Sequence, residues 1–266
     1  MGATTEFMSA DEIKRVYPHG VREIIGGGAF GWQRGEVTDD TQMAICVMQA
    51  AMASEGNGQL DMFKFVSECE RRFVEWYESK PKDIGNTCAE GILRLKDGKF
   101  PTVVSSLGNG GLMRAWPLAV VGEVTANVIQ NNITHMNQTC IQAVEKYSES
   151  MQHYLQSGFS GGYANGYMQP TGCVVNTLNN ALLNASLAIT FEEGIVWPVN
   201  DGGDSDTIAC VTGGLVGARF GFQAIPKKWV HQLDPSARKV LDQYVDWACG
   251  YLERKQARLS ASSFKR

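Results

Sequence analysis

The sequence contains no CxxC pair, although it has seven cysteines, at positions 46, 69, 88, 140, 173, 210 and 249. Cysteine zinc sites use close pairs, and disulfide frameworks use an even number of cysteines, so neither is indicated here. Most of the cysteines lie in apolar helical contexts, as Cys46 and Cys210 do. This placement indicates small core residues in a reducing compartment, and we expect a cytoplasmic protein.

An excess of basic charge is also absent. Lysine and arginine number 24 against 28 aspartates and glutamates, for a formal net charge of -4, and no basic stripe stands out. Nucleic-acid binding needs clustered cations to neutralise phosphates, so a nucleic-acid partner is not expected. A mildly acidic chain would suit cation binding instead, if some of its acids converge.

Long apolar runs and common catalytic signatures are missing as well. The longest apolar stretch, 112–121, is interrupted by Arg114 and Pro117, which makes it too short and too broken to span a membrane. Residues 1–6 show no basic region followed by an apolar run, so no secretory signal is indicated. G-x-S-x-G, H-E-x-x-H and Walker-type motifs are absent.

Helical periodicity dominates what is present, and no convincing alternating strand stands out, so we predict an all-α fold. The predicted helices are Thr38–Ser54, Leu60–Glu78, Asn86–Lys96, Asn137–Gln156, Thr177–Ile189, Ser205–Phe220 and Pro235–Lys255.

The chain reads as one domain over residues 1–266, because no Pro/Ser-rich linker and no internal repeat divides it. The polar tail 257–266 is expected to be frayed. Glycine-rich segments lie between the predicted helices, at 26–31, 108–111, 157–166 and 202–203.

Two acidic clusters each follow a glycine-containing loop or turn and open an apolar helix. One is Thr38-Asp39-Asp40-Thr41, and the other is the segment Gly202-Gly203-Asp204-Ser205-Asp206-Thr207. Taken singly, each fits an ordinary helix N-terminus, with Thr38 or Asp204 as the capping side chain. Taken together, they supply at least six hard oxygen ligands, a set that suits Mg²⁺ or Mn²⁺ without histidine or cysteine.

A third element, Asn109-Gly110-Gly111-Leu112-Met113-Arg114, has glycines that let backbone N–H groups approach a phosphate or a ribose. A glycine-rich loop alone is a weak signal. Arg114 is either a phosphate contact or a structural ion-pair partner, and its place in an apolar run favours the structural role. The four histidines, at 19, 135, 153 and 231, are too scattered to form a metal cluster by spacing.

The order of these motifs, with Ile133-Thr134-His135 between the glycine loop and the second acidic cluster, resembles the ADP-ribosylglycohydrolase family along nearly the whole chain. The resemblance implies a compact all-α fold with two divalent ions, Mg²⁺ or Mn²⁺, at the base of a cleft at helix N-termini. The metal ligands it implies are Thr38, Asp39, Asp40, Asp204, Asp206 and Thr207.

The implied substrate is ADP-ribose linked to a protein side chain, arginine above the alternatives, and the implied product is ADP-ribose. Asn109, Gly110, Gly111 and His135 match positions that contact the ligand. Asp39 and Asp40 would serve catalysis, with one metal-bridging Asp orienting a water.

Glu6 matches a family glutamate that faces the ligand cleft, which would make it a catalytic and substrate-binding residue. Family members usually begin with an apolar helix that ends in Gly-Asp-x-x-Gly, and here Met1-Gly2 corresponds to the end of that motif. From this start we expect residues 1–6 to be poorly held and some apolar surface to be exposed.

Two further positions depart from the pattern. Cys173 stands where relatives commonly carry tyrosine. The resemblance places this position near the cleft, so the difference would affect specificity for the attached side chain. Asp201 is an extra acid beside the second cluster, and either supports the ligands from behind or is a solvated loop residue, of which the loop residue is favoured.

Three hypotheses follow. The leading one is a metal-dependent hydrolase that reverses mono-ADP-ribosylation. The second is a non-catalytic module that binds ADP-ribose or an ADP-ribosyltransferase, although the complete ligand set argues against it. The third is a structural α-domain in which both acidic clusters are only caps.

Overall fold

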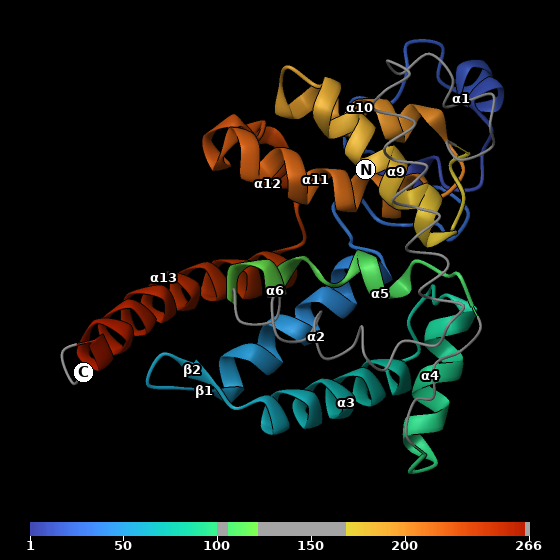
Figure 1. The fold of residues 1–266 in the computed structure, drawn as a ribbon. Coiled ribbons are helices and arrows are strands. Elements are labelled where there is room, and N and C mark those ends of the chain that lie inside the picture. The colour runs from blue at the N-terminus through green and yellow to red at the C-terminus, as the bar shows by residue number, and fades with distance from the viewer. Residues whose placement is uncertain (100–105, 122–168, 264–266) are drawn as a thin grey trace.

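The computed structural model describes residues 1–99, 106–121 and 169–263, and within these ranges the fold is built from helices with one small hairpin (Figure 1). The all-α prediction is confirmed. The elements are η1 (Gly2–Thr4), α1 (Ala10–Val16), α2 (Asp39–Ser54), β1 (Glu55–Gly56), β2 (Gln59–Leu60), α3 (Met62–Glu78), α4 (Asn86–Lys96), α5 (Gly110–Met113), α6 (Trp116–Val121), α9 (Val174–Leu187), α10 (Phe191–Asp201), α11 (Ser205–Phe220), η3 (Phe222–Ala224), α12 (Lys227–Gln232) and α13 (Pro235–Ser263).

The predicted bounds of α4 and α11 agree with the structure, and those of α2 differ by one residue. Helix α9 begins three residues earlier than predicted and ends at Leu187. The predicted helix Asn137–Gln156 and the glycine-rich segment 157–166 lie outside the described residues.

The antiparallel hairpin of β1 and β2 was missed by the sequence analysis. Its turn is Asn57-Gly58, with φ of 53° and 74°, which is the residue pair that tight hairpin turns favour. Helix α3 therefore starts at Met62 rather than Leu60, and the carboxylate of Asp61 caps it by accepting from the Lys64 N–H at 3.0 Å.

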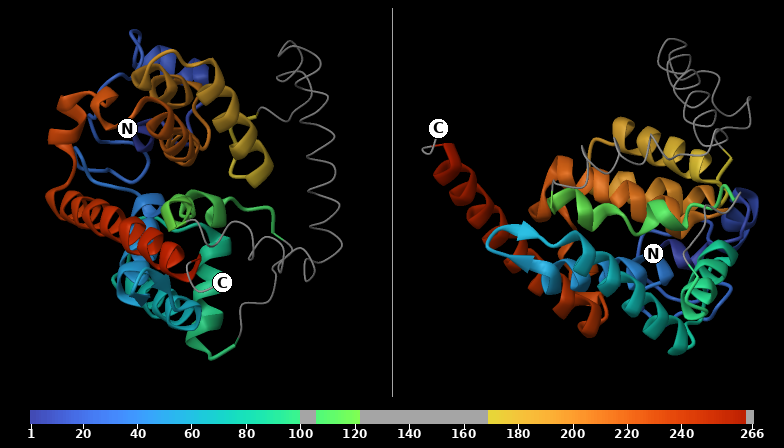
Figure 2. Two further views of the ribbon diagram at one scale, coloured as in Figure 1. Left: turned by 60° about the vertical axis from the view of Figure 1, so that its left-hand side comes forward. Right: turned by 60° about the horizontal axis from the view of Figure 1, so that its bottom comes forward.

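The hairpin contacts the long helix α13, which extends beyond the neighbouring helices (Figure 2). Arg254 forms an ion pair with Glu55 at 2.9 Å, and Arg258 donates to the side-chain oxygen of Gln59 at 2.7 Å. The expectation of a frayed tail from residue 257 is wrong as far as Ser263, because α13 continues to that point.

Of the three hydrophobic cores within the described ranges, two hold the helices α2 and α11. One joins α2, α3 and α13 and contains Met48, Phe65, Tyr244 and Tyr251. The other joins α10, α11 and α12 and contains residues such as Val199, Val216 and Trp229. Each core fixes one of the two helices that carry the acidic clusters.

The N-terminal segment is held firmly against the start of α11, so the expectation that residues 1–6 are poorly held is wrong. The Thr5 hydroxyl is fully buried and bonds to the carbonyl of Val199 at 2.6 Å. Ser205 donates from its hydroxyl to the carbonyl of Gly2 at 2.9 Å. A side chain at Gly2 would lie 2.5 Å from the backbone of Asp206, so the two backbones approach as closely as glycine allows.

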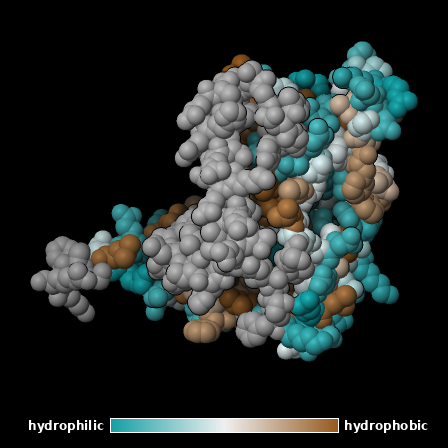
Figure 3. Space-filling model, turned by 45° about the vertical axis from the view of Figure 1, so that its right-hand side comes forward, coloured by the Kyte–Doolittle hydropathy of each residue, from teal (hydrophilic) through white to brown (hydrophobic). Residues whose placement is uncertain are grey.

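Within residues 1–99, 106–121 and 169–263, no helix combines the length and the apolar character that crossing a membrane requires. On the face shown in Figure 3, the coloured surface is mostly hydrophilic with smaller hydrophobic patches.

The buried Thr5 hydroxyl generates a prediction about stability. Thr5→Val keeps the shape of the side chain but leaves the Val199 carbonyl without this donor, which should cost roughly 1–3 kcal/mol of unfolding free energy. Urea unfolding measures the change. Thr5→Ser is the matched control, because it retains the hydroxyl and should lose less stability. Equal losses in the two variants would show that the hydrogen bond is not what anchors the segment.

Candidate metal and substrate cleft

The first turn of α2 presents two buried acids. Asp39 and Asp40 are 6% and 1% exposed. Thr38 stands at the N-cap position, but it makes no capping hydrogen bond within the described ranges, and its hydroxyl instead donates to Asp40 Oδ2 at 2.8 Å. The local structure therefore directs polar groups toward each other rather than toward the free N–H groups of the helix.

The first turn of α11 repeats this arrangement. Asp204 is the N-cap residue by position, and again no capping bond is formed with the residues that the structure describes. Its Oδ2 accepts a hydrogen bond from the side-chain amide of Asn109 at 2.5 Å. Asp206 and Thr207 follow on the first turn and are buried. The hypothesis that both clusters are only caps is wrong, because neither Thr38 nor Asp204 performs that task.

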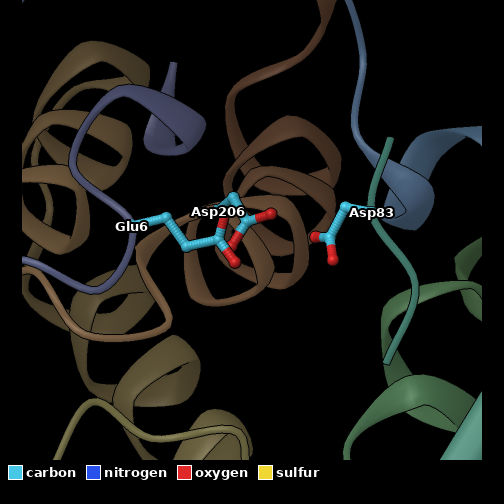
Figure 4. A group of neighbouring side chains, drawn as sticks. All are labelled: Glu6, Asp83 and Asp206. Carbon is cyan, nitrogen blue, oxygen red and sulfur yellow. The ribbon is translucent and has the colours of Figure 1, made fainter. Parts of the chain in front are cut away.

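The two helix starts converge. One carboxylate oxygen each from Asp39, Asp40 and Asp206 lies within 4.8 Å of the others. A second group of three shares Asp206 and adds Glu6 and Asp83 at the same spacing. Figure 4 shows Glu6 reaching from the N-terminal segment toward Asp206, with Asp83 approaching from the opposite side. Five acids from four segments therefore meet in one place.

Asp83 was not found by the sequence analysis. It lies in the loop before α4, between Lys82 and Ile84, and a single acid in a short loop looks like an ordinary solvated residue. The fold brings this loop against the starts of α2 and α11, a contact that no local sequence pattern indicates.

Three loops close the cleft above these acids. The Asn109 backbone N–H donates to the Gly172 carbonyl at 3.0 Å, and the Asp204 N–H donates to the Pro170 carbonyl at 2.8 Å. The cavity that results has a volume of about 440 Å³. Its walls include Glu6, Phe7, Asp39, Asp83, Gly85, Thr87, Cys88, Asn109, Gly110, Thr171, Gly172, Asp204, Asp206 and Thr207.

The acids perturb one another strongly. Burial, followed by the charges of Asp206 and Asp83, raises the pKa of Glu6 to about 9. Burial, followed by the charge of Asp83, raises the pKa of Asp39 to about 6. For Asp40, burial and the neighbouring Asp39 raise the pKa to about 7. For Asp206, burial and the charges of Asp40 and Asp204 raise the pKa well above its ordinary value. The cluster therefore resists full ionisation unless a positive charge enters it.

The donor set fits a divalent cation. Glu6 Oε2, Asp40 Oδ1 and Asp206 Oδ1 are buried and have no hydrogen-bond partner among the residues that the structure describes. No lysine, arginine or histidine occurs among the described residues of the cavity wall. Buried carboxylate oxygens without partners or counter-charge are what a hard cation such as Mg²⁺ or Mn²⁺ would satisfy.

The other predicted site residues are placed as follows. Asn109 and Gly110 line the cavity, whereas Gly111 is exposed beside it and is not part of the wall. Thr207 lines the cavity, whereas Thr38 is not part of the wall and donates its hydroxyl to Asp40. His135 lies outside the described residues.

Arg114 is structural, but not through the ion pair that the sequence suggested. Its Nη1 lies 3.2 Å from Cys88 Sγ and 3.6 Å from Met43 Sδ, and its guanidinium stacks 4.9 Å from the centre of the Phe73 ring. No described carboxylate is within ion-pair distance of it. The side chain thus packs behind the cleft.

Two further residues border the site. Cys173 is the N-cap of α9 and pairs through its backbone with Gly108. Asp201 is the last residue of α10, outside the cavity wall and half-buried, and burial raises its pKa, so it is neither a loop residue nor fully solvated.

Comparison with known proteins agrees with this geometry. The family model for ADP-ribosylglycohydrolase matches residues 1–169 and 145–258. The ADP-ribosyl-[dinitrogen reductase] glycohydrolase of Rhodospirillum rubrum is 30% identical, over 92% of this chain and 90% of its own. The ADP-ribosylarginine hydrolase Tri1 of Serratia proteamaculans is 26% identical, over 88% of this chain and 71% of its own.

A solved structure described as an ADP-ribosylglycohydrolase-related protein complex superposes with a TM-score of 0.67 at 24% identity, covering 96% of this chain and 92% of that one. This likeness supports the fold. The match of the family model and the similarity to the Rhodospirillum protein confirm the resemblance seen in the motifs. The chain belongs to the ADP-ribosylglycohydrolase family and is a hydrolase.

Proposed function

We propose that the protein is a divalent-metal-dependent hydrolase that releases ADP-ribose from an ADP-ribosylated arginine side chain of a protein. The observation that carries the proposal is the convergence of Asp39, Asp40 and Asp206, with buried oxygens that lack partners among the described residues. Arginine is favoured as the acceptor because two of the relatives are named ADP-ribosylarginine hydrolases.

The proposed metal ligands are the six residues of the two acidic clusters, which would hold two ions, Mg²⁺ or Mn²⁺. These residues are Thr38, Asp39, Asp40, Asp204, Asp206 and Thr207. When bound, the cations would hold the ribose hydroxyls and polarise the attacking water as the glycosidic bond breaks.

The acids at the cavity wall have distinct proposed roles. Asp39 faces the cavity and would orient the attacking water and accept its proton. Asp40 accepts a hydrogen bond from the Thr38 hydroxyl, and its carboxylate would help to keep Asp39 and the cations in position. Glu6 reaches in from the N-terminal segment and would position the ribose at the bond that breaks (Figure 4).

The loops above the acids would bind the rest of ADP-ribose. The Asn109 amide is fixed by donating to both Asp204 and Thr177, so the backbone at Gly110 has a defined position. A side chain on Gly110 would collide with Cys88 Sγ, so the backbone here packs directly against that side chain. Gly111, beside the cavity, and His135, outside the described residues, complete the proposed contacts.

The chemistry of the substrate defines the proposed partners. An ADP-ribosylated protein is consumed and ADP-ribose is released, so an ADP-ribosyltransferase reaction must supply the substrate. We propose a cytoplasmic location, which the unpaired thiols of the six cysteines in the described ranges support.

Removal of single ligands tests the assignment. Asp39→Ala and Asp206→Ala should lower kcat by roughly a thousandfold or more, because each removes a ligand and a charge from the cluster. Their melting temperatures should not fall much, since a buried like charge is removed as well. Release of ADP-ribose from an arginine-ADP-ribosylated protein is the assay. Asp201→Asn is the matched control, as it alters a nearby partly buried acid outside the cavity, and it should retain turnover. Activity retained in either alanine variant would refute its ligand role.

Binding of the metal can be measured without turnover. Mn²⁺ or Mg²⁺ should raise the melting temperature of chelator-treated protein, since a cation at a hundredfold excess over its Kd stabilises by about 2.7 kcal/mol. Asp206→Ala should abolish most of this shift. A shift of the same size in that variant would place the cation elsewhere.

The raised pKa values also predict a pH dependence. In metal-free protein the buried carboxyls stabilise the fold while they are protonated, so stability should decline from about pH 4, as Asp39, Asp40 and Glu6 ionise near pH 6, 7 and 9. The stabilisation by Mn²⁺ should increase over the same window, because the ligands must lose their protons. Thermal melts at several pH values test both trends, and a metal-free protein that gains stability from pH 5 to 9 would contradict them.

A further inference from the structure

A second cavity adjoins the metal cleft. It has a volume of about 540 Å³, and two residues, Glu6 and Phe7, line both cavities. Its remaining wall comes from η1, α1 and the glycine-rich loop 26–31, and consists of Thr4, Met8, Glu12, Arg15, Val16, Gly28 and Ala29. The Glu6–Phe7 pair is therefore a partition between the space over the acids and a space on their other side.

The partition is held in a strained conformation. Phe7 has a φ of 65°, a value that favours glycine, and its side chain is 66% exposed. Its backbone is fixed on both sides, since the Phe7 N–H donates to the Gly203 carbonyl and the Gly203 N–H donates to the Met8 carbonyl, both at 2.8 Å. A large exposed ring at a position that glycine would occupy more easily points to a role for the ring itself.

An aromatic row leads away from the partition. The Phe7 ring meets Phe30 edge-on at 6.1 Å, Phe30 meets Trp32 at the same distance, and the Lys82 ammonium lies 5.2 Å from the centre of the Trp32 ring. Lys82 directly precedes Asp83 of the cleft. The row thus borders the acids along one side.

The glycine-rich loop 26–31 holds this row of aromatic rings in position. Gly27 and Trp32 exchange backbone hydrogen bonds at 2.8 Å, which closes the loop. A side chain at Gly28 would collide with the carbonyl of Ala3, so the loop packs directly on η1. Phe30 is thereby presented next to Phe7.

We propose that the second cavity binds the acceptor side of the conjugate, namely the peptide that flanks the modified arginine, with the Phe7 ring stacking on the guanidinium group at the boundary. This inference rests on the proposed function. A cavity of this size accommodates one or two side chains beside a backbone, and an aromatic face next to a carboxylate is a favourable environment for a guanidinium cation. Glu12 and Arg15 lie 4.0 Å apart on α1 and contribute no net charge to this wall, which leaves Glu6 as the acid beside the guanidinium.

The test compares two substrates of the metal-loaded protein: an arginine-ADP-ribosylated peptide of about ten residues and free ADP-ribosylarginine. The quantity measured is the ratio of kcat/KM for the peptide to kcat/KM for the free conjugate. Val16→Trp should fill the second cavity from an exposed position at the end of α1, and should lower the ratio by roughly tenfold through KM of the peptide.

Phe7→Gly removes the ring and relieves the strained backbone. Because both substrates carry the guanidinium group, this variant should lower kcat/KM for both by roughly tenfold. Its melting temperature should stay the same or rise, which a purely structural role for Phe7 would not produce. Phe222→Ala is the matched control, because Phe222 is 64% exposed on η3 and lines neither the second cavity nor the metal cleft. It should leave the ratio unchanged.

The inference is overturned, and the proposed function left standing, if the native protein cleaves free ADP-ribosylarginine while the ratio stays unchanged in Val16→Trp and kcat/KM for both substrates stays unchanged in Phe7→Gly. Failure of the native protein to cleave either substrate overturns the proposed function, and the inference with it.

Discussion

Electrostatic repulsion among buried carboxylates is the constraint on which the rest of this structure depends. Asp39, Asp40 and Asp206 are brought within 4.8 Å of one another, and Glu6 and Asp83 approach the same point. Such an arrangement is unfavourable in a low-dielectric interior, and the raised pKa values of the acids are its direct expression. The remaining architecture can be understood as what holds these groups together against their repulsion until a cation neutralises them.

Three features provide that restraint. Each of the two helices that carry the acids is anchored in its own hydrophobic core, so neither can move away without exposing apolar surface. The N-terminal segment is bound to the start of α11 through Thr5 and Ser205, and this fixes Glu6. Asn109 ties a third loop to Asp204. The same anchoring of the N-terminal segment sets the strained backbone of Phe7 and so links the metal cleft to the second cavity.

Some features could be predicted because their signals lie in contiguous segments of the sequence. They are the fold class, the bounds of α4 and α11, and the two acidic clusters. Threonine and paired aspartates before an apolar run identify a helix start with oxygen ligands, and the order of the motifs identifies the family. Asp83 was not predictable, since its role arises from contact between a short loop and two distant helices. The burial of Glu6 was missed for the same reason: the bonds that hold its segment join residues about 200 positions apart. The hairpin at Asn57-Gly58 had a local signal, but its strands are only two residues long, too short to show alternation.

We propose that the acids of α2 and α11 form a metal centre. Anomalous diffraction at the manganese edge, from crystals of the protein grown with Mn²⁺, tests it most directly. We expect two peaks between the first turns of these helices, each at roughly 2.0–2.2 Å from carboxylate oxygens of Asp39, Asp40, Asp204 or Asp206. Crystals that bind Mn²⁺ elsewhere, or none at this point with all four carboxylates in place, would contradict the claim.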